Sequence, residues 1–209
     1  SRAGEVSLAL TIPSAVALMV IPVPLVSVLF ERGQTTAADS AAIAQAVAIY
    51  GLGLPAFVLQ KILQPLFFAR EDTKTPFRYA LVAMVVNAVA AIGLTPVLGW
   101  LAPAIATTMA GWAMVVLLMI GGRRFGDVAR FDARFHRRIW RICVAAAIMG
   151  AVLMGAALVL QDALTTAGLR YLALAWLVSI GIVTFFGSGQ LIGAFRLSEF
   201  RNAMRRGRR

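Results

Sequence analysis

The sequence predicts an all-α membrane protein, a polytopic bundle of six transmembrane helices. Of its 209 residues, 60% are hydrophobic and the mean hydropathy is +0.84, whereas soluble domains are about 45–50% apolar. The apolar residues form long runs with almost no charge, which suit a bilayer core that needs about 20 helical residues. The runs lack the alternation of transmembrane β-strands. The predicted spans are Val6–Phe30, Ala41–Ala69, Phe77–Leu98, Leu101–Gly122, Ile139–Leu160 and Tyr171–Phe195.

The first predicted span contains three prolines, Pro13, Pro22 and Pro24. Because proline removes a helical hydrogen bond, the motif "IPVP" predicts a bent or partly unwound helix near the outer end. In the polar segment "ERGQTTAADS" that follows, Gly33 can supply a left-handed turn. Thr36 and Asp39 have the spacing of a capping box, so the second helix is predicted to begin near Ala37.

The second predicted helix is longer than a bilayer requires. From Ala37 to Ala69 it would measure about 50 Å, so it must tilt, bend or project. We expect the bend at "GLGLP", Gly51–Pro55. The third and fourth spans are separated only by "TPVLGWLAP", which predicts a tight turn at the membrane surface beside Trp100. A single re-entrant structure is the alternative, and it would need protein around its non-helical backbone.

Between the second and third spans, the stretch "FFAREDTKTPFR" crowds charged residues into a short break. Thr75 precedes Pro76, which predicts a helix N-cap with proline at the first helical position. Asp72 can accept hydrogen bonds in the turn or at the helix start. Arg70 and Lys74 would hold the turn on the cytoplasmic side. Short cytoplasmic loops need such residues in any case, so this composition alone does not establish a function.

The central loop, "GGRRFGDVARFDARFHRRIWR", interleaves aromatic residues with arginines. This pattern predicts an interfacial amphipathic helix and is a weaker indication of RNA binding. His136 has no Cys or His at ligand spacing, so no metal site is expected. The sixth span carries Gly189 and Gly193 at GxxxG spacing. The expected organisation is four spans in 1–122, a basic loop in 123–138, two spans in 139–195 and a polybasic tail in 196–209.

The net charge of +11 predicts the orientation in the membrane. With the N-terminus inside, 17 of the 20 basic residues lie in cytoplasmic segments, as the positive-inside rule requires. Both ends are therefore expected to be cytoplasmic, with no nucleic-acid partner. The single cysteine, Cys143, cannot form an internal disulfide. Because the chain starts with Ser1 and its first span lacks a cleavage site, we expect a piece of a longer membrane protein.

One cation, Lys61, lies well inside a predicted span, where a lysine costs about 2.5–3.5 kcal/mol. Gln60 and Gln64 flank it, and Asn87 adds a polar position in the next span. These four residues are the candidates for a polar cavity that binds an anionic phosphate group. The alternative is that Lys61 extends its stem to the cytoplasmic interface. No enzyme motif is present, so neither catalysis nor a cofactor is predicted.

Two stretches carry a family resemblance: "LFERG" at Leu29–Gly33 and "YGLGLPAFVLQKILQPLFFAREDTKTPFR" at Tyr50–Arg78. They resemble the MurJ/MviN lipid II flippases of bacteria, which belong to the multidrug/oligosaccharidyl-lipid/polysaccharide exporter superfamily. The family usually has an aromatic residue after "RG", where this chain has Gln34 and Thr35. That departure concerns the outer loop around Glu31, Arg32 and Gly33.

The resemblance implies a transporter of fourteen spans, of which this chain would form the last six. The first four would complete the second lobe, and the last two would hold the lipid tail, with a missing N-terminal lobe as partner. The implied activity is flipping of lipid II across the bacterial inner membrane by alternating access. Lys61 would line the cavity, and the Arg70–Pro76 hairpin would shape the cytoplasmic gate. The alternatives are a flippase for another polyprenyl-linked glycan, such as O-antigen or capsule units, and a non-transporting scaffold.

Overall fold

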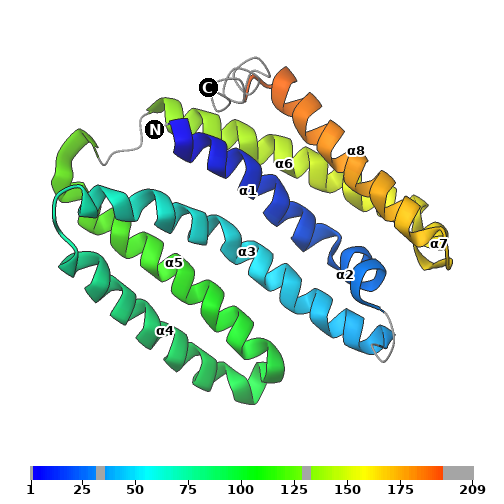
Figure 1. Ribbon diagram of the computed structural model, residues 1–209, viewed down its shortest axis with the longest axis horizontal. Helices are drawn as coiled ribbons and strands as arrows, with labels where there is room; N and C mark the ends of the chain where they lie inside the picture. The colour runs from blue at the N-terminus through cyan, green and yellow to red at the C-terminus, as the bar shows by residue number, and fades with distance from the viewer. Residues whose placement is uncertain (1, 32–35, 129–132, 195–209) are drawn as a thin grey trace, which may run out of the picture. The chain divides into compact units, whose positions relative to one another are not determined.

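The computed structural model describes residues 2–31, 36–128 and 133–194, and this part of the chain contains helices and no strand (Figure 1). The all-α prediction is therefore confirmed. The elements in chain order are α1 (Arg2–Val20), α2 (Pro22–Phe30), α3 (Ala37–Phe68), α4 (Lys74–Leu98), the 3₁₀ turn η1 (Gly99–Leu101), α5 (Ala102–Gly122), the 3₁₀ segment η2 (Arg123–Val128), α6 (Ala133–Val159), α7 (Gln161–Thr165) and α8 (Arg170–Leu191).

The chain divides into two compact units, Ser1–Phe131 and Asp132–Arg209. The division falls inside the basic loop expected at 123–138. The polybasic tail expected at 196–209 lies outside the described residues.

Four stretches of the described chain are long and apolar enough to cross a membrane: Ala37–Phe68, Lys74–Gly126, Arg137–Val159 and Arg170–Leu191. The bent pair Gly4–Val20 and Pro22–Phe30 gives a fifth if it is one span. Lys74–Gly126 contains both α4 and α5, which pack against each other along their lengths (Figure 1). Each of the six predicted segments thus has a helical counterpart.

The predicted bend in the first segment is confirmed. α1 and α2 meet at an angle of 82°, and the break is at Ile21, directly before Pro22 at the start of α2. Proline lacks an N–H and its ring clashes with the preceding turn, which explains why the helix breaks there. α2 ends at Phe30 and is capped by Glu31, whose backbone N–H donates to the Ser27 carbonyl. Arg32 and Gly33 lie outside the described residues.

α3 begins where the capping box predicted. The Thr36 hydroxyl accepts from the Asp39 N–H at 3.2 Å, and the Asp39 carboxylate accepts from the Thr36 N–H at 2.9 Å. From Ala37 the helix continues to Phe68 without interruption. The bend expected at Gly51–Pro55 therefore does not break the helix.

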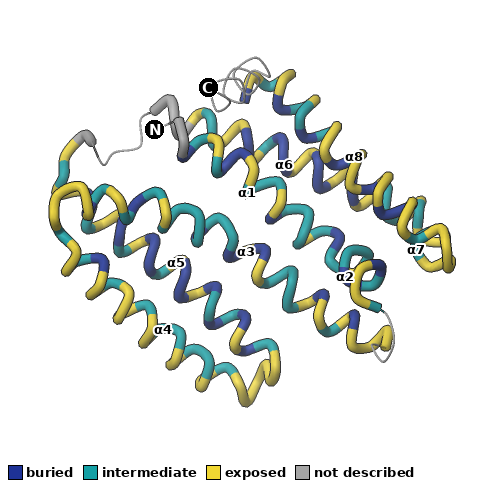
Figure 2. The backbone as a smooth tube through the Cα atoms, viewed as in Figure 1, coloured by how far each residue is buried: buried dark blue, intermediate teal, exposed yellow. Residues whose placement is uncertain are grey.

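The glycines of α3 serve close packing on both of its flanks. A Cβ at Gly51 would lie 3.1 Å from the Leu18 Cβ and 3.2 Å from the Ala15 carbonyl oxygen of α1. A Cβ at Gly53 would lie 3.1 Å from the Thr108 hydroxyl of α5. Dark segments along α3 and α5 mark this buried contact (Figure 2). α3 is thus the central helix of its unit, in contact with α1 and α5.

The break between the third and fourth segments is a tight turn, as predicted. α4 ends at Leu98, Gly99 adopts a φ of 55°, and α5 begins at Ala102. The positive φ suits glycine, which has no Cβ to clash. The two helices on either side of this turn pack against each other.

In the second unit, the predicted interfacial helix does not exist as a separate element. α6 begins at Ala133 and runs without a break into the fifth predicted span. Residues 129–132 lie outside the described part of the chain. A helix already started in the basic loop has no reason to stop at Ile139, because no proline or glycine intervenes.

The end of α8 corrects the expectation for the GxxxG pair. Gly193 has a φ of 72° and follows the helix, so it forms a turn instead of a packing face. The close glycine contact is made by Gly181, where a Cβ would lie 3.1 Å from Leu153 of α6. Two α6 arginines complete the end of α8: Arg138 Nε donates to the Ala194 carbonyl at 2.9 Å, and Arg141 donates to the Gly193 carbonyl at 3.2 Å.

The contact between α1 and α3 predicts the effect of substitutions at Gly51. Gly51→Val should lower the free energy of unfolding by about 1–3 kcal/mol, because the added atoms meet the backbone of α1. Thermal unfolding in detergent would measure this. Gly93→Val in α4 is the matched control, since it makes the same change in a helix where nothing lies within 4 Å of a Cβ. Equal losses at both positions would contradict the packing role of Gly51.

Candidate functional site: the Arg70–Pro76 hairpin and the end of α5

The chain leaves α3 through a Schellman turn. The Asp72 N–H donates to the Phe67 carbonyl at 3.1 Å, and the Glu71 N–H donates to the Phe68 carbonyl at 3.0 Å. This pair of bonds satisfies carbonyls that a helix end leaves without partners. Glu71 takes the left-handed position with a φ of 58°, where glycine is usual. The turn places the Asp72 side chain directly before α4.

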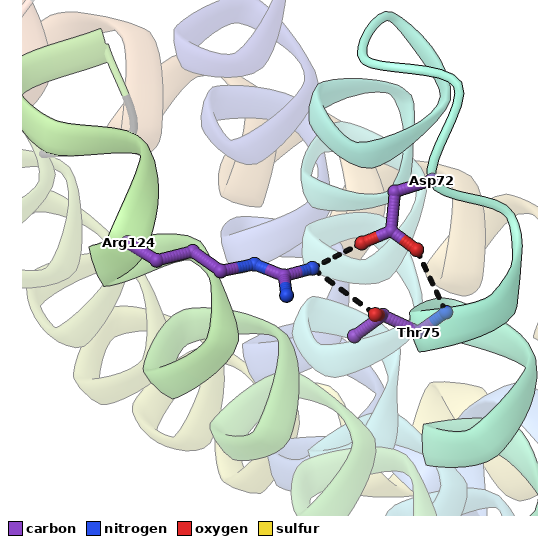
Figure 3. A network of polar contacts seen from close by, with 3 residues as sticks. All are labelled: Asp72, Thr75 and Arg124. Atoms are coloured by element: carbon purple, nitrogen blue, oxygen red, sulfur yellow. Dashed lines mark hydrogen bonds and ion pairs between the residues drawn. The ribbon is translucent and has the colours of Figure 1, made fainter.

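Asp72 is the centre of a polar network that joins three elements (Figure 3). Its carboxylate accepts from the Thr75 N–H at 3.0 Å and forms an ion pair with Arg124 of η2. The same Arg124 nitrogen donates to the Thr75 hydroxyl at 3.0 Å. The network therefore ties the α3–α4 turn and the first turn of α4 to the chain that leaves α5.

The prediction that Thr75 caps α4 is wrong. α4 begins at Lys74, so Thr75 and Pro76 are its second and third residues, and the preceding Thr73 makes no side-chain cap. Asp72 accepts the Thr75 N–H instead, as the sequence allowed. Pro76 is buried, and its missing N–H is one of the donors that a helix start leaves unpaired.

The surroundings of Asp72 lower the pKa of its carboxyl group below the ordinary value. Hydrogen bonds from the Thr75 hydroxyl and N–H are the largest cause, and the positive charge of Arg124 adds to them. Each of these favours the ionised form. Asp72 therefore stays a carboxylate at neutral pH and keeps its partners.

An aromatic cluster lies beneath this network. Phe67 is fully buried and makes edge-to-face contacts with Phe125, at 5.0 Å between ring centroids, and with Tyr79, at 6.4 Å. The ring of Phe125 carries the Arg70 guanidinium at 4.6 Å and the Arg124 guanidinium at 4.9 Å. The Tyr79 hydroxyl packs directly against Gly121 of α5, where a Cβ would clash.

Of the predicted cavity residues, Gln60 has a structural contact. Its side-chain amide donates to the Gly111 carbonyl of α5 at 2.9 Å. Two further bonds follow the same interface, from Thr108 to the Ile49 carbonyl and from Trp112 to the Leu52 carbonyl, both at 3.1 Å. Polar side chains that bond backbone across helices are a common device of membrane bundles.

The other three cavity candidates are not brought together by hydrogen bonds. Lys61 is exposed on α3 and makes no hydrogen bond or ion pair with any residue that the structure describes. Gln64 is half-buried on α3, and Asn87 is half-buried on α4. Gln60 and Lys61 therefore differ in their contacts: Gln60 joins α3 to α5, whereas the Lys61 side chain is exposed on the surface of its unit.

Sequence reasoning missed Arg124 as the partner of Asp72. The signal was available: the predicted topology places 70–78 and 123–124 at the same membrane surface, where cations greatly outnumber acids. A carboxylate in such surroundings has a cation within reach, although the sequence does not say which one. Among the described residues, no group of three or more Cys, His, Asp or Glu side chains could hold a metal ion.

The chain was compared with known protein families. Residues 1–180 match the family model described as "Lipid II flippase MurJ". The chain belongs to the lipid II flippase MurJ family. A probable lipid II flippase MurJ of Rhizobium meliloti (strain 1021) is 40% identical over 99% of this chain. A second, from Vibrio cholerae serotype O1, is 33% identical over 93% of it.

A solved structure shares the fold of this MurJ family member. It is described as "Lipid II flippase MurJ, inward closed conformation", has a TM-score of 0.74 and 25% sequence identity, and is matched over 91% of this chain. The chain spans 39% of the Rhizobium meliloti relative, 37% of the Vibrio cholerae relative and 37% of the solved chain. The resemblance seen in the sequence is confirmed.

The network predicts different effects for two neighbouring carboxylates. Asp72→Asn should lower the melting temperature measurably, because it removes the charge that Arg124 pairs with. Glu71→Gln, which deletes the same charge one residue earlier, should leave it nearly unchanged. Thermal unfolding at neutral pH would compare them. If Glu71→Gln were as destabilising as Asp72→Asn, net charge and not the specific pair would be responsible.

The lowered pKa of Asp72 also predicts a pH dependence. Since the folded pKa lies below the unfolded value, the stabilisation is present above the ordinary pKa of 3.8 and is lost as the pH falls through the folded value. The difference in melting temperature between wild type and Asp72→Asn should therefore shrink in acid. A difference that stayed constant from neutral pH to about pH 2 would contradict this linkage.

Proposed function

We propose that the protein takes part in moving lipid II, the undecaprenyl-pyrophosphate-linked peptidoglycan precursor, across the bacterial inner membrane by alternating access. The observation that carries the proposal is the family match over residues 1–180. It acts as a transporter and catalyses no covalent step. Because the chain spans about two fifths of its relatives, we propose that it forms the second lobe and two additional helices beside an N-terminal lobe.

The proposed orientation follows from charge. We place six spans across the membrane, with α4 and α5 as separate crossings, because the two helices pack side by side around the turn at Gly99. The Arg70–Pro76 hairpin and η2 then lie at the cytoplasmic surface, where cations are retained. The turn at Gly99 and the capping box at Thr36 lie on the periplasmic side.

Lys61 is the proposed cavity cation. It shares one face of α3 with Tyr50 and Phe68, which lie three and two helical turns away, and both of these are exposed. A pyrophosphate cannot enter hydrocarbon without a polar, cationic environment. An exposed lysine that no described carboxylate pairs with supports a role in binding that phosphate.

The hairpin is the proposed cytoplasmic gate. Alternating access requires helices that move together as a body. The Asp72–Arg124–Thr75 network fastens the cytoplasmic ends of α3, α4 and α5 to one another. Arg70 and Lys74 are exposed on the same hairpin, so they would line the entrance that this body opens and closes.

The test of function is complementation by the full gene in cells depleted of their own lipid II flippase. Wild type should restore growth and cell shape. Lys61→Ala should reduce lipid II flipping by about tenfold, the effect of losing one charged hydrogen bond to the cargo, and Lys61→Arg should retain most of it. Wild-type failure would favour another polyprenyl-linked glycan as cargo. Full activity of Lys61→Ala would remove the cavity role of this lysine.

The orientation has its own test. In the full gene product with its cysteines replaced, Cys143→Ala among them, single cysteines are placed at the exposed positions Thr73 and Ala38. A membrane-impermeant maleimide should label Ala38→Cys in intact spheroplasts and Thr73→Cys only in inverted vesicles. The reverse pattern would overturn the topology, whereas labelling of both from one side would overturn the span count between them.

A further inference from the structure

The ring of Phe125 holds two guanidinium groups at the surface of the first unit. Arg70 lies 4.6 Å and Arg124 lies 4.9 Å from the ring centroid. Phe125 is itself fixed by its edge contact with the buried Phe67. Stacking on a fixed ring restricts both arginine side chains, so they are preorganised before any ligand arrives.

These two cations are only partly engaged by the carboxylates near them. Asp72 is the carboxylate in contact with Arg124, and its other oxygen already accepts from Thr75. The Arg70 guanidinium makes no hydrogen bond and no ion pair with any residue of the described chain. Arg124 uses one terminal nitrogen for both of its bonds, and its side chain is still 50% exposed. The site therefore keeps several N–H donors that no described residue uses.

The surroundings favour a ligand with a phosphate headgroup and apolar chains. Guanidinium groups bind phosphate oxygens through paired N–H donors. In α4, the next helix, Phe77 is 65% exposed, and exposed phenylalanines on a segment rich in Lys and Arg are typical of surfaces that enter the boundary between headgroups and acyl chains. Apolar rings at that level contact acyl chains while the arginines face the phosphates.

We propose that Arg70 and Arg124, held over Phe125, form a specific binding site for the phosphodiester of an anionic phospholipid. The site is distinct from Lys61, and it would hold a lipid of the surrounding membrane instead of the cargo. A bound lipid would bridge the α3–α4 turn and η2, as the Asp72–Arg124 pair does. Lipid binding would thus stabilise the same junction that the network fastens.

The test uses the full gene product in a neutral detergent, with dioleoyl-phosphatidylglycerol as the probe and dioleoyl-phosphatidylcholine as the uncharged comparison. Native mass spectrometry gives the apparent affinity, and the rise in melting temperature gives the stabilisation. Phosphatidylglycerol should bind and stabilise wild type far more than phosphatidylcholine does. Arg70→Gln should weaken phosphatidylglycerol binding about tenfold, the effect of one charge-assisted contact.

Arg123→Gln is the matched control, because it deletes an equal charge from an exposed arginine adjacent to Arg124 that has no contact with the ring among the described residues. It should change phosphatidylglycerol affinity by less than about twofold, as expected for a screened surface charge. Arg70→Lys should lose part of the affinity, since it keeps the charge but not the planar fork. Phe125→Leu should lose affinity while both arginines remain.

Three results would overturn the proposal. Equal losses in Arg70→Gln and Arg123→Gln would show general attraction of anionic lipid to a basic surface. Displacement of phosphatidylglycerol by millimolar inorganic phosphate would show a site for free phosphate. Preference for an undecaprenyl pyrophosphate over phosphatidylglycerol would make this a cargo site. The readout is phospholipid binding and not transport, so its failure leaves the proposed function standing, and a failed complementation leaves this site standing.

Discussion

The structure of the first unit depends on how closely α3 approaches its neighbours. Between helices in lipid there is no hydrophobic driving force, since acyl chains are as apolar as leucine side chains. Stability then comes from close van der Waals contact and from hydrogen bonds across helices. Gly51 allows the close van der Waals contact, because without a Cβ it lets the backbone of α1 approach α3. Gln60 and Trp112 provide the hydrogen bonds across helices, since their side chains donate to backbone carbonyls across the interface of α3 and α5.

That interface also determines the position of the hairpin. Because α3 and α5 are held in register along their length, Phe67 at the end of one meets Phe125 just beyond the end of the other. The aromatic contact brings Arg124 to the turn where Asp72 accepts it. The hairpin between α3 and α4 is thus part of the packed structure. The order of residues in the hairpin matters, because Phe67 makes the ring contact, Asp72 makes the ion pair and Thr75 donates its N–H.

The sequence was sufficient for features that depend on neighbouring residues. The helix start at Ala37, the break before Pro22 and the tight turn at Gly99 all followed from local backbone chemistry, and the structure contains each of them. Thr75 failed as a cap because the Schellman turn placed Asp72 in that role, and a left-handed Glu71 is not a pattern that propensity favours. The pairing of Asp72 with Arg124 depends on residues far apart in sequence, so only the packing of α3 and α5 could reveal it.

The cations show that position in the fold, and not composition, decides which partners a charged side chain contacts. The positive-inside rule treats the arginines of the predicted cytoplasmic segments alike. In the second unit, Arg138 and Arg141 donate to the last carbonyls of α8 and so complete a helix end. In the first unit, Arg124 pairs with Asp72. Arg70 and Lys61 donate no hydrogen bond to any residue that the structure describes. An anionic ligand gains most from cations that the protein has already oriented but not neutralised. By this criterion Arg70, stacked on a fixed ring, is better prepared than Lys61, for which the described chain provides no such support.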